Sequence, residues 1–303
     1  MHTPKTSIIQ QIPLQGKGDI QLYMKREDLI HPYISGNKFR KLKYNIKDAK
    51  LIKKQTVLTF GGAYSNHIAA TAYACKENGL DSIGIIRGEE LEGKIGGNPT
   101  LSFAQSCGMQ FLFISREAYR KKSHTTFLKK LKEKFGDFYL IPEGGTNELA
   151  VRGCEEILNP EDAIYDYICT CVGTGGTISG IINASKKHQK ILGFPALKGD
   201  FLKQDIRKFA SQENWELVKE YHFGGYGKLK PELITFINTF KRDYNIPLDP
   251  IYTGKMMFGI FDLFKNGFFP KNSKILVIHT GGLQGVAGMN LKLKRKNLPL
   301  IEQ

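Results

Sequence analysis

The segment from Ser35 to Tyr44 contains the side chain with the most distinctive chemistry, Lys38, which directly follows Ser-Gly-Asn at the start of a helical run. This turn can hold the backbone while the amine reaches into a cleft. A buried lysine loses the water that favours its ammonium form, so its pKa falls and the free amine becomes a nucleophile. Such an amine can form a Schiff base with an aldehyde cofactor. The alternative is a solvated basic helix start, since Lys41 and Lys43 lie close by.

A glycine-rich turn follows a probable strand at 167–172 and leads into a probable helix. Consecutive unhindered amides and two hydroxyls suit a phosphate, and a helix N-terminus attracts anions. The turn lacks the lysine of a nucleotide P-loop, and its glycine spacing differs from the dinucleotide fingerprint. A purely steric role for the glycines stays open. The phosphate interpretation places the anion on Gly173, Thr174, Gly175, Gly176 and Thr177.

A second turn, Ser65-Asn66-His67, also joins a β-branched run to an apolar helical pattern. Its amides and short polar side chains could bind an anion the size of a carboxylate. Ordinary N-capping of the helix by Ser65 or Asn66 explains the same residues equally well.

Strands and helices alternate along the chain, which predicts an α/β protein with mostly parallel, open twisted sheets and helices on both faces. In such sheets ligands bind at the carboxyl ends of the strands, where the glycine-rich turns lie. A single helix is expected at 116–135, and 198–220 is expected to be helical. The Pro-Glu-Gly-Gly-Thr-Asn segment at 142–147 interrupts the alternation. We expect two domains, a larger one from 1–42 and 150–303 and a smaller one inserted at 43–149.

Composition excludes several classes of protein. No apolar run of the 303 residues reaches membrane-spanning length, and the first residues lack the apolar core of a signal peptide, so a cytoplasmic location is expected. The odd number of cysteines, 5, without metal-ligand spacing predicts reduced thiols, and Cys169 and Cys171 should share the core face of one strand. The formal charge of +15 raises nucleic-acid binding as a hypothesis, but the basic runs at 129–132 and 292–296 carry no interleaved aromatic residues.

Taken in order, the turns resemble those of one family of pyridoxal-phosphate enzymes, that of 1-aminocyclopropane-1-carboxylate (ACC) deaminase and D-cysteine desulfhydrase. The resemblance runs from about Lys25 to Gly285. It implies the tryptophan synthase β-like fold, fold type II, and pyridoxal 5'-phosphate as cofactor. The motifs are Ser-Gly-Asn-Lys, Tyr-Ser-Asn-His, Gly-Thr-Gly-Gly-Thr, Gly-Gly-Tyr-Gly, Asp-Pro-Ile-Tyr-Thr-Gly-Lys and His-Thr-Gly-Gly-Leu.

The resemblance also implies roles for single residues. Lys38 matches the lysine that forms the Schiff base, and the 173–177 turn matches the phosphate site. Asn66 matches the asparagine beside the pyridine 3′-oxygen, and Ser65 the serine near the substrate carboxylate. Thr280 matches a hydroxyl opposite the pyridine nitrogen. Tyr226 and Tyr252 match two tyrosines that face the substrate, and His67 and Thr253 match additional substrate-binding positions. Without the resemblance, packing would explain both tyrosines. His67 and His279 are expected to orient neighbours, and no metal is expected.

The resemblance implies a lyase or deaminase that acts on a small amino acid, with a homodimer expected and neither nucleic acid nor membrane as partner. ACC deaminases carry Glu after the tyrosine of the Tyr-x-Gly-Lys motif and Leu after the histidine of the last turn. Here these positions are Thr253 and Thr280, as in the D-cysteine enzymes of the family. We therefore expect D-cysteine desulfhydrase activity. The alternatives are ACC deaminase, or a non-catalytic protein that keeps the fold and binds anions or nucleic acid.

Overall fold

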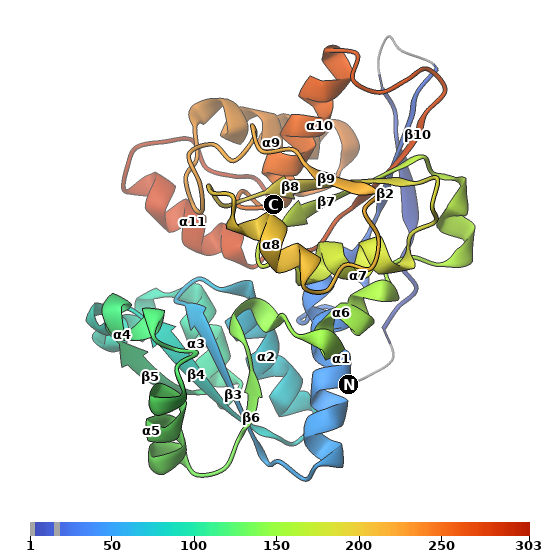
Figure 1. Cartoon of the computed structure of the whole chain (residues 1–303). Helices are drawn as coiled ribbons and strands as arrows, with labels where there is room; N and C mark the ends of the chain where they lie inside the picture. The colour runs from blue at the N-terminus through green and yellow to red at the C-terminus, as the bar shows by residue number, and fades with distance from the viewer. Residues whose placement is uncertain (1–3, 15–18) are drawn as a thin grey trace.

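The computed structural model describes residues 4–14 and 19–303, which form two sheets with helices on their faces (Figure 1). The larger sheet has six strands in the order β1-β2-β10-β7-β8-β9, and all neighbours are parallel except β1 and β2. The strands are β1 (Ile9–Ile12), β2 (Gln21–Lys25), β7 (Tyr167–Val172), β8 (Lys190–Pro195), β9 (Trp215–Leu217) and β10 (Lys274–Ile278).

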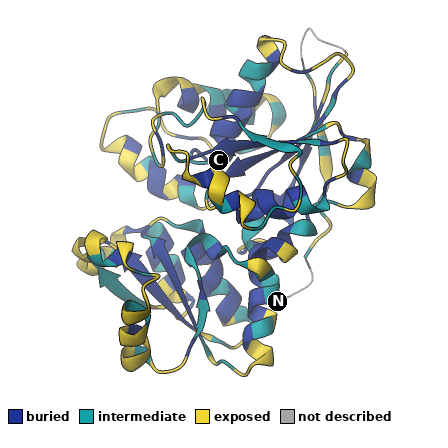
Figure 2. Ribbon diagram, viewed as in Figure 1, coloured by how far each residue is buried: buried dark blue, intermediate teal, exposed yellow. Residues whose placement is uncertain are grey.

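The smaller sheet has four parallel strands in the order β5-β4-β3-β6. Its central strands are buried over five consecutive residues each, as expected for strands covered on both faces. In Figure 2 these strands are buried, whereas the outer surfaces of the helices are exposed. The strands are β3 (Thr56–Gly62), β4 (Asp81–Arg87), β5 (Gln110–Ile114) and β6 (Tyr139–Ile141).

Helices join successive parallel strands, so the predicted α/β class with mostly parallel sheets is confirmed. The helices of the first half are α1 (Asn37–Leu51), α2 (Asn66–Glu77), α3 (Pro99–Ser106), α4 (Arg116–Arg120), α5 (Thr125–Phe135) and α6 (Glu148–Glu155). Those of the second half are α7 (Gly176–Ala184), α8 (Phe201–Arg207), α9 (Pro231–Tyr244), α10 (Thr253–Lys265) and α11 (Gly285–Lys294).

Two expectations about helices were wrong. The segment 116–135 is divided into α4 and α5 by a turn, which lets Tyr119 and Leu131 both reach the core from separate helices. The segment 198–220 is helical only over α8, and it then supplies β9 to the edge of the larger sheet. This strand is hard to recognise from sequence because Trp215–Leu217 is only three residues long and none of them is fully buried.

All four strands of the smaller sheet lie between residues 56 and 141, and the strands of the larger sheet lie outside that range. The predicted domain boundary near 42/43 falls within α1, so the chain would pass between the two units along a continuous helix. The boundaries themselves stay a prediction. Across 4–14 and 19–303, no helix combines the length and the apolar character needed to cross a membrane.

Candidate active site

A cavity of about 530 Å³ opens between the carboxyl ends of the two sheets. The structure brings nearly all of the predicted site residues to its wall, although they come from turns spread over most of the chain. The predicted residues that line it are Lys38, Ser65, Asn66, His67, Gly173, Thr174, Gly175, Thr177, Tyr226, Tyr252 and Thr280. Gly176 lies directly behind the wall, and Thr253 is discussed below.

Lys38 enters this cavity from the first turn of α1. The N-cap residue Gly36 has a φ of 62°, and a Cβ atom on it would lie 1.9 Å from the carbonyl oxygen of Thr280. Only glycine allows this approach, which joins the Lys38 turn to the end of β10. Burial lowers the pKa of Lys38. No hydrogen-bond partner of its Nζ atom is found in the described part of the chain, so the amine is available to a ligand.

The glycine-rich turn at 173–177 is built for close approach to its backbone. Gly175, the N-cap of α7, has a φ of 86°, in the left-handed region. A Cβ atom on Gly176 would lie 3.2 Å from Lys41 Nζ, and one on Gly173 would lie 3.2 Å from the Tyr252 ring. Asn37 Nδ2 donates to Thr177 Oγ1 (2.8 Å), which fixes the turn against the start of α1. The amides at the N-terminus of α7 therefore face the cavity without side chains in the way.

Lys41 is the site residue that the sequence interpretation missed. Its side chain is buried, and Nζ donates to Gly144 O (3.0 Å) and Thr146 Oγ1 (2.9 Å) and lies 3.4 Å from Thr174 Oγ1. Burial and the neighbouring Lys38 lower its pKa to about 7. Spacing offered one signal: Lys38 and Lys41 are three residues apart and share a face of α1. A cation beside the helix N-terminus completes an anion site for a phosphate.

The Ser65-Asn66-His67 turn begins α2 on the opposite side of the cavity. Ser65 Oγ accepts a hydrogen bond from His67 N (3.2 Å), so Ser65 does cap the helix, as the structural alternative predicted. Capping does not exclude the ligand role, because both residues also line the cavity. Asn66 Oδ1 accepts a hydrogen bond from Gln284 Nε2 (2.8 Å). This contact joins the start of α2 to the start of α11 and orients the Asn66 amide.

His67 is neutral and has one free acceptor. Thr59 Oγ1 donates its proton to Ile141 O (2.8 Å), so it must accept from His67 Nε2 (2.8 Å), and the ring carries its proton on Nε2. Burial, together with the charges of Lys38 and Lys41, lowers the pKa of His67 well below its usual value. Its Nδ1 atom is buried, and no described residue donates to it.

Tyr226 and Tyr252 meet edge to face at the cavity wall, with ring centroids 6.2 Å apart. Burial raises the pKa of both hydroxyl groups, so both are protonated donors. Tyr226 belongs to a loop whose glycines Gly224, Gly225 and Gly227 all have positive φ. Lys255, from α10, holds this loop by donating to His222 O (2.9 Å) and Gly225 O (2.8 Å).

Thr253 does not reach the cavity, although a substrate contact was expected of it. Its side chain is buried at the start of α10, where Thr253 Oγ1 donates to Asp249 Oδ1 (2.9 Å). Asp249 also accepts from the backbone amides of residues 251–253 and so caps the helix. Thr253 therefore acts on the site only by fixing the turn that presents Tyr252.

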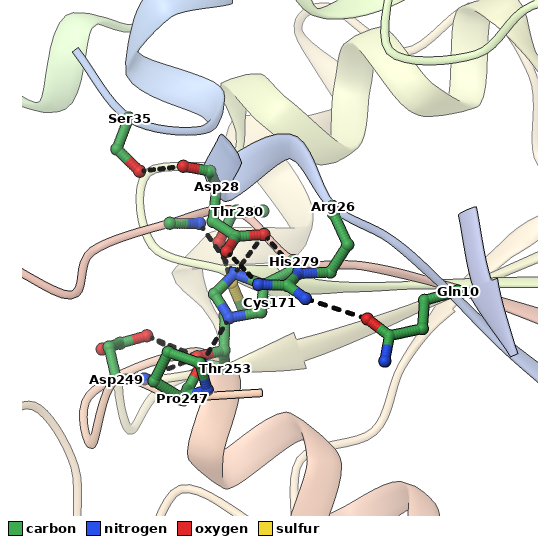
Figure 3. Close-up of polar contacts among 11 residues, drawn as sticks. Gln10, Arg26, Asp28, Ser35, Cys171, Pro247, Asp249, Thr253, His279 and Thr280 are labelled. Atoms are coloured by element: carbon green, nitrogen blue, oxygen red, sulfur yellow. Dashed lines mark hydrogen bonds and ion pairs between the residues drawn. The ribbon is translucent and has the colours of Figure 1, made fainter. Parts of the chain in front are cut away.

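Thr280 closes the floor of the cavity, where its Oγ1 atom lies 3.0 Å from Cys171 Sγ (Figure 3). Cys169 and Cys171 are both buried on the same face of β7, as predicted. Burial raises the pKa of Cys171 to about 12, so its thiol stays neutral and can donate. This part of the cavity wall, next to the Lys38 turn, thus offers a hydroxyl and a thiol.

A buried polar network behind Thr280 holds this turn in place (Figure 3). His279 Nε2 donates to Pro247 O (2.8 Å), and its Nδ1 accepts from Gly281 N (3.2 Å), as expected for the orienting role predicted for His279. Asp28 lies 3.5 Å from this ring and forms a two-pronged ion pair with Arg26, at 2.9 Å and 2.8 Å. Arg26 and Asp28 are both buried.

These residues fit a pyridoxal phosphate. Lys38 offers an amine without a partner among the described residues, and the 173–177 turn leaves backbone that a Cβ atom would obstruct. Lys41 supplies a cation beside that turn, and Thr280 a hydroxyl on the floor. Within 4–14 and 19–303, no three histidine, cysteine or carboxylate side chains gather in a way that could hold a metal ion.

Comparison with known proteins adds independent findings. The family model described as pyridoxal-phosphate dependent enzyme matches residues 2–281. The bifunctional D-cysteine desulfhydrase/1-aminocyclopropane-1-carboxylate deaminase, mitochondrial, of Arabidopsis thaliana is 33% identical over 88% of this chain and 73% of its own length. The 1-aminocyclopropane-1-carboxylate deaminase of Rhizobium rhizogenes is 30% identical over 89% of both chains.

Solved structures agree in fold. The crystal structure of an ACC deaminase homologue superimposes with a TM-score of 0.82, at 28% identity, and covers 97% of this chain and 94% of that one. An O-ureido-L-serine synthase superimposes with a TM-score of 0.68 at 12% identity, covering 93% of this chain and 90% of its own, which shows a shared fold only.

Proposed function

Because this chain belongs to the pyridoxal-phosphate-dependent enzyme family, we propose that it removes the β-substituent and the amino group of a small D-amino acid. D-Cysteine is the substrate we favour, with pyruvate, sulfide and ammonia as products. The name of the Arabidopsis relative, which includes D-cysteine desulfhydrase, supports this proposal.

The preference for D-cysteine over ACC rests on one observation, the neutral floor of the cavity. Thr280 stands there with Cys171, and the nearby carboxylate of Asp249 is occupied with capping α10 and does not line the cavity. A carboxylate beside a pyridine nitrogen keeps the ring protonated and strengthens its withdrawal of electrons, which a carbon–carbon cleavage needs. A hydroxyl does not, so this floor suits the easier loss of a good leaving group such as a thiolate.

Each part of the cavity has a task in this reaction. Lys41 and the 173–177 turn would hold the cofactor phosphate, and Thr280 would face its ring nitrogen. When bound, the cofactor withdraws electrons from the substrate Cα and makes its proton acidic. Burial lowers the pKa of Lys38, which makes its free amine more available to take that proton. The Ser65 turn would bind the carboxylate, and Tyr226 with Tyr252 would cover the substrate.

Loss of the Cα proton to Lys38 leaves an electron pair that forms the Cα–Cβ double bond, while the Cβ–S bond breaks and sulfur leaves with its electrons. Water then converts the released aminoacrylate to pyruvate and ammonia. The overall reaction consumes one water for each D-cysteine and needs no oxidant.

ACC deamination is the second candidate, because both named relatives carry that activity in their names. A panel of D- and L-amino acids plus ACC, scored for ammonia, keto acid and sulfide, separates the two candidates. We expect pyruvate, sulfide and ammonia in equal amounts from D-cysteine, and none with the Lys38→Ala protein. Ready formation of 2-oxobutanoate from ACC, without sulfide from D-cysteine, would overturn the proposal. Absence of both, with no cofactor absorbance, would instead favour the non-catalytic alternative.

We also propose, from the resemblance of the chain to its family, that the protein works as a homodimer in the cytoplasm. Light scattering should give twice the mass of the chain, and cell fractionation should place the protein with cytoplasmic markers.

A further inference from the structure

Arg87 is a charged residue of the cavity that the reaction described above does not use. It is the last residue of β4, and its side chain lines the cavity. Its Nη2 atom lies 3.8 Å from the position that a Cβ atom on Gly62 would occupy. Gly62 ends β3, just before the Ser65 turn. The guanidinium therefore stands on the side where the substrate carboxylate is expected, away from the phosphate.

The guanidinium lies against an aromatic ring, and no acidic partner for it is found among the described residues. Its central carbon lies 5.7 Å from the centroid of the Tyr119 ring, within the range of a cation–π contact. Glu143, the carboxylate on the same wall, is already engaged: it accepts from Tyr119 OH (2.8 Å) and pairs with Lys122 (3.2 Å). No ion pair of Arg87 is found in the part of the chain that the structure describes.

Arg87 also acts on the tyrosine expected to face the substrate. Burial raises the pKa of the Tyr226 hydroxyl, and the positive charge of Arg87 opposes that rise. The guanidinium is thus close enough to Tyr226 to influence it across the cavity. Arg87, Tyr226 and the Ser65 turn line the same cavity. If the Ser65 turn binds the carboxylate of an amino acid, we expect the substrate side chain to extend into this cavity within reach of the guanidinium.

We propose that Arg87 binds negative charge on the β-substituent of the substrate and so determines which amino acids the enzyme accepts. The planar guanidinium donates two parallel hydrogen bonds to a carboxylate or a similar anion, and it is always charged. For D-cysteine, this interaction stabilises the electron pair that sulfur carries away as the Cβ–S bond breaks. The proposal rests on the elimination function for this last step, but its anion-binding part stands independently.

A binding experiment tests the anion preference without requiring turnover. D-Aspartate and D-asparagine have the same shape and differ in the charge on the side chain, and neither has a good leaving group. Calorimetric titration of the holoenzyme should give at least tenfold tighter binding of D-aspartate. Arg87→Gln should abolish this preference, and Arg87→Lys should keep part of it. Arg120→Gln removes the same charge from α4, outside the cavity, and should leave the preference unchanged.

A turnover experiment tests the leaving-group role. We expect Arg87→Gln to lower kcat/KM for D-cysteine by about 10- to 100-fold, and for β-chloro-D-alanine by no more than about threefold, since chloride leaves readily without help. An equal loss for both substrates would mean that Arg87 has only a structural role. The proposal is overturned if the wild-type enzyme fails to bind D-aspartate or binds D-asparagine as tightly. If neither substrate reacts while D-aspartate is still preferred, the elimination function fails and the anion site stands.

Discussion

The two halves of the cavity differ in how firmly the protein holds them. On the phosphate side, formed by Lys41, Thr146 and the 173–177 turn, the side chain of Lys41 is only 2% exposed, and its polar contacts lie within the protein. On the substrate side, formed by the Ser65 turn, Arg87 and the Tyr226 loop, Tyr226 is 45% exposed and Arg87 has no acidic partner among the described residues.

This difference separates what the fold requires from what the substrate requires. The phosphate side is built from close contacts that tolerate little change, because a Cβ atom at its glycines would meet neighbouring atoms at 2.9–3.2 Å. The substrate side consists of side chains at strand ends and in loops, which can be exchanged without disturbing a core. We therefore expect the cofactor chemistry to be insensitive to changes that alter substrate choice. Four substitutions test this expectation.

Lys38 stands between the two sides, so its loss should have the largest effect. Lys38→Ala removes the amine that binds the cofactor aldehyde and moves the Cα proton, and we expect turnover to fall by about 10⁴-fold or more. The near-visible absorbance of the bound cofactor should shift, while the melting temperature of the cofactor-free protein should change little. Borohydride reduction followed by peptide mapping should label Lys38 in the wild type, and labelling of another lysine would refute the assignment.

Gly175→Val should break the phosphate side alone. Gly175 has a φ of 86°, and a Cβ atom there would lie 3.1 Å from Ile206 Cγ1. We expect cofactor affinity to fall on the order of 100-fold, because the turn must shift away from the phosphate. Gly108→Val is the matched control, since Gly108 has a φ of 90° but open space around its Cβ position. Retention of wild-type cofactor affinity by Gly175→Val would show that the phosphate lies elsewhere.

The same division explains what the sequence could predict. Gly175 and Ser65 lie in short turns that follow strands, and Lys38 lies in the first turn of α1. In all three places the neighbouring residues alone carry the signal. The contacts of Lys41 were not predictable in this way, because its partners lie 103, 105 and 133 residues away. Arg87 was not predicted as a site residue, since nothing in its local sequence shows that β4 ends at a cavity.

The errors in the helices have a similar cause. A helical pattern at 116–135 does not reveal that the chain turns to place both Tyr119 and Leu131 against the sheet, and the β9 strand is defined by its pairing with β8 rather than by its own residues. Thr253 was assigned to the substrate from its position in a motif. Its side chain instead points to Asp249, which only the packing of α10 decides.

Lys41→Met should show how phosphate binding on the phosphate side of the cavity depends on pH. Because the pKa of Lys41 is about 7, its amine loses its proton above neutral pH unless a phosphate is bound. The affinity of the cofactor-free protein for inorganic phosphate should therefore fall above pH 7, by about tenfold in total once Lys41 is neutral. Lys41→Met should weaken binding about tenfold and remove this pH dependence. Titration calorimetry between pH 7.5 and 9 measures both effects.

Lys43→Met provides the control, because the side chain of Lys43 is 38% exposed and pairs with Glu156 outside the cavity.

The lowered pKa of Lys41 should also make the stability of the protein depend on pH. The pKa of Lys41 is lowered from 10.5, so between pH 7 and about 10 the unfolded chain holds a proton that the folded protein has released. The free energy of unfolding of the cofactor-free protein should consequently rise with pH over this range, and less so in Lys41→Met. Unchanged pH dependence in that variant would assign the effect to another group.

Lys255→Met should break the substrate side alone, with the smallest effect. Lys255 is buried, burial lowers its pKa to about 8, and its amine donates to two carbonyl oxygens of the Tyr226 loop. Methionine keeps most of the volume but leaves both acceptors without this donor, which costs about 1–3 kcal/mol of stability. The loop should then hold Tyr226 less firmly, because its glycines, which have positive φ, can adopt other backbone conformations at little cost.

We therefore expect Lys255→Met to raise KM for the amino acid by about three- to tenfold, with kcat and cofactor affinity within twofold of the wild type. Lys255→Arg should recover part of the loss, since it still donates to the carbonyl oxygens. Lys241→Met, on the exposed surface of α9, controls for loss of a lysine. A merely structural role would lower the melting temperature without moving KM. A fall in cofactor affinity equal to the rise in KM would show that the two sides of the cavity are not independent, because a change confined to the Tyr226 loop would have reached the phosphate.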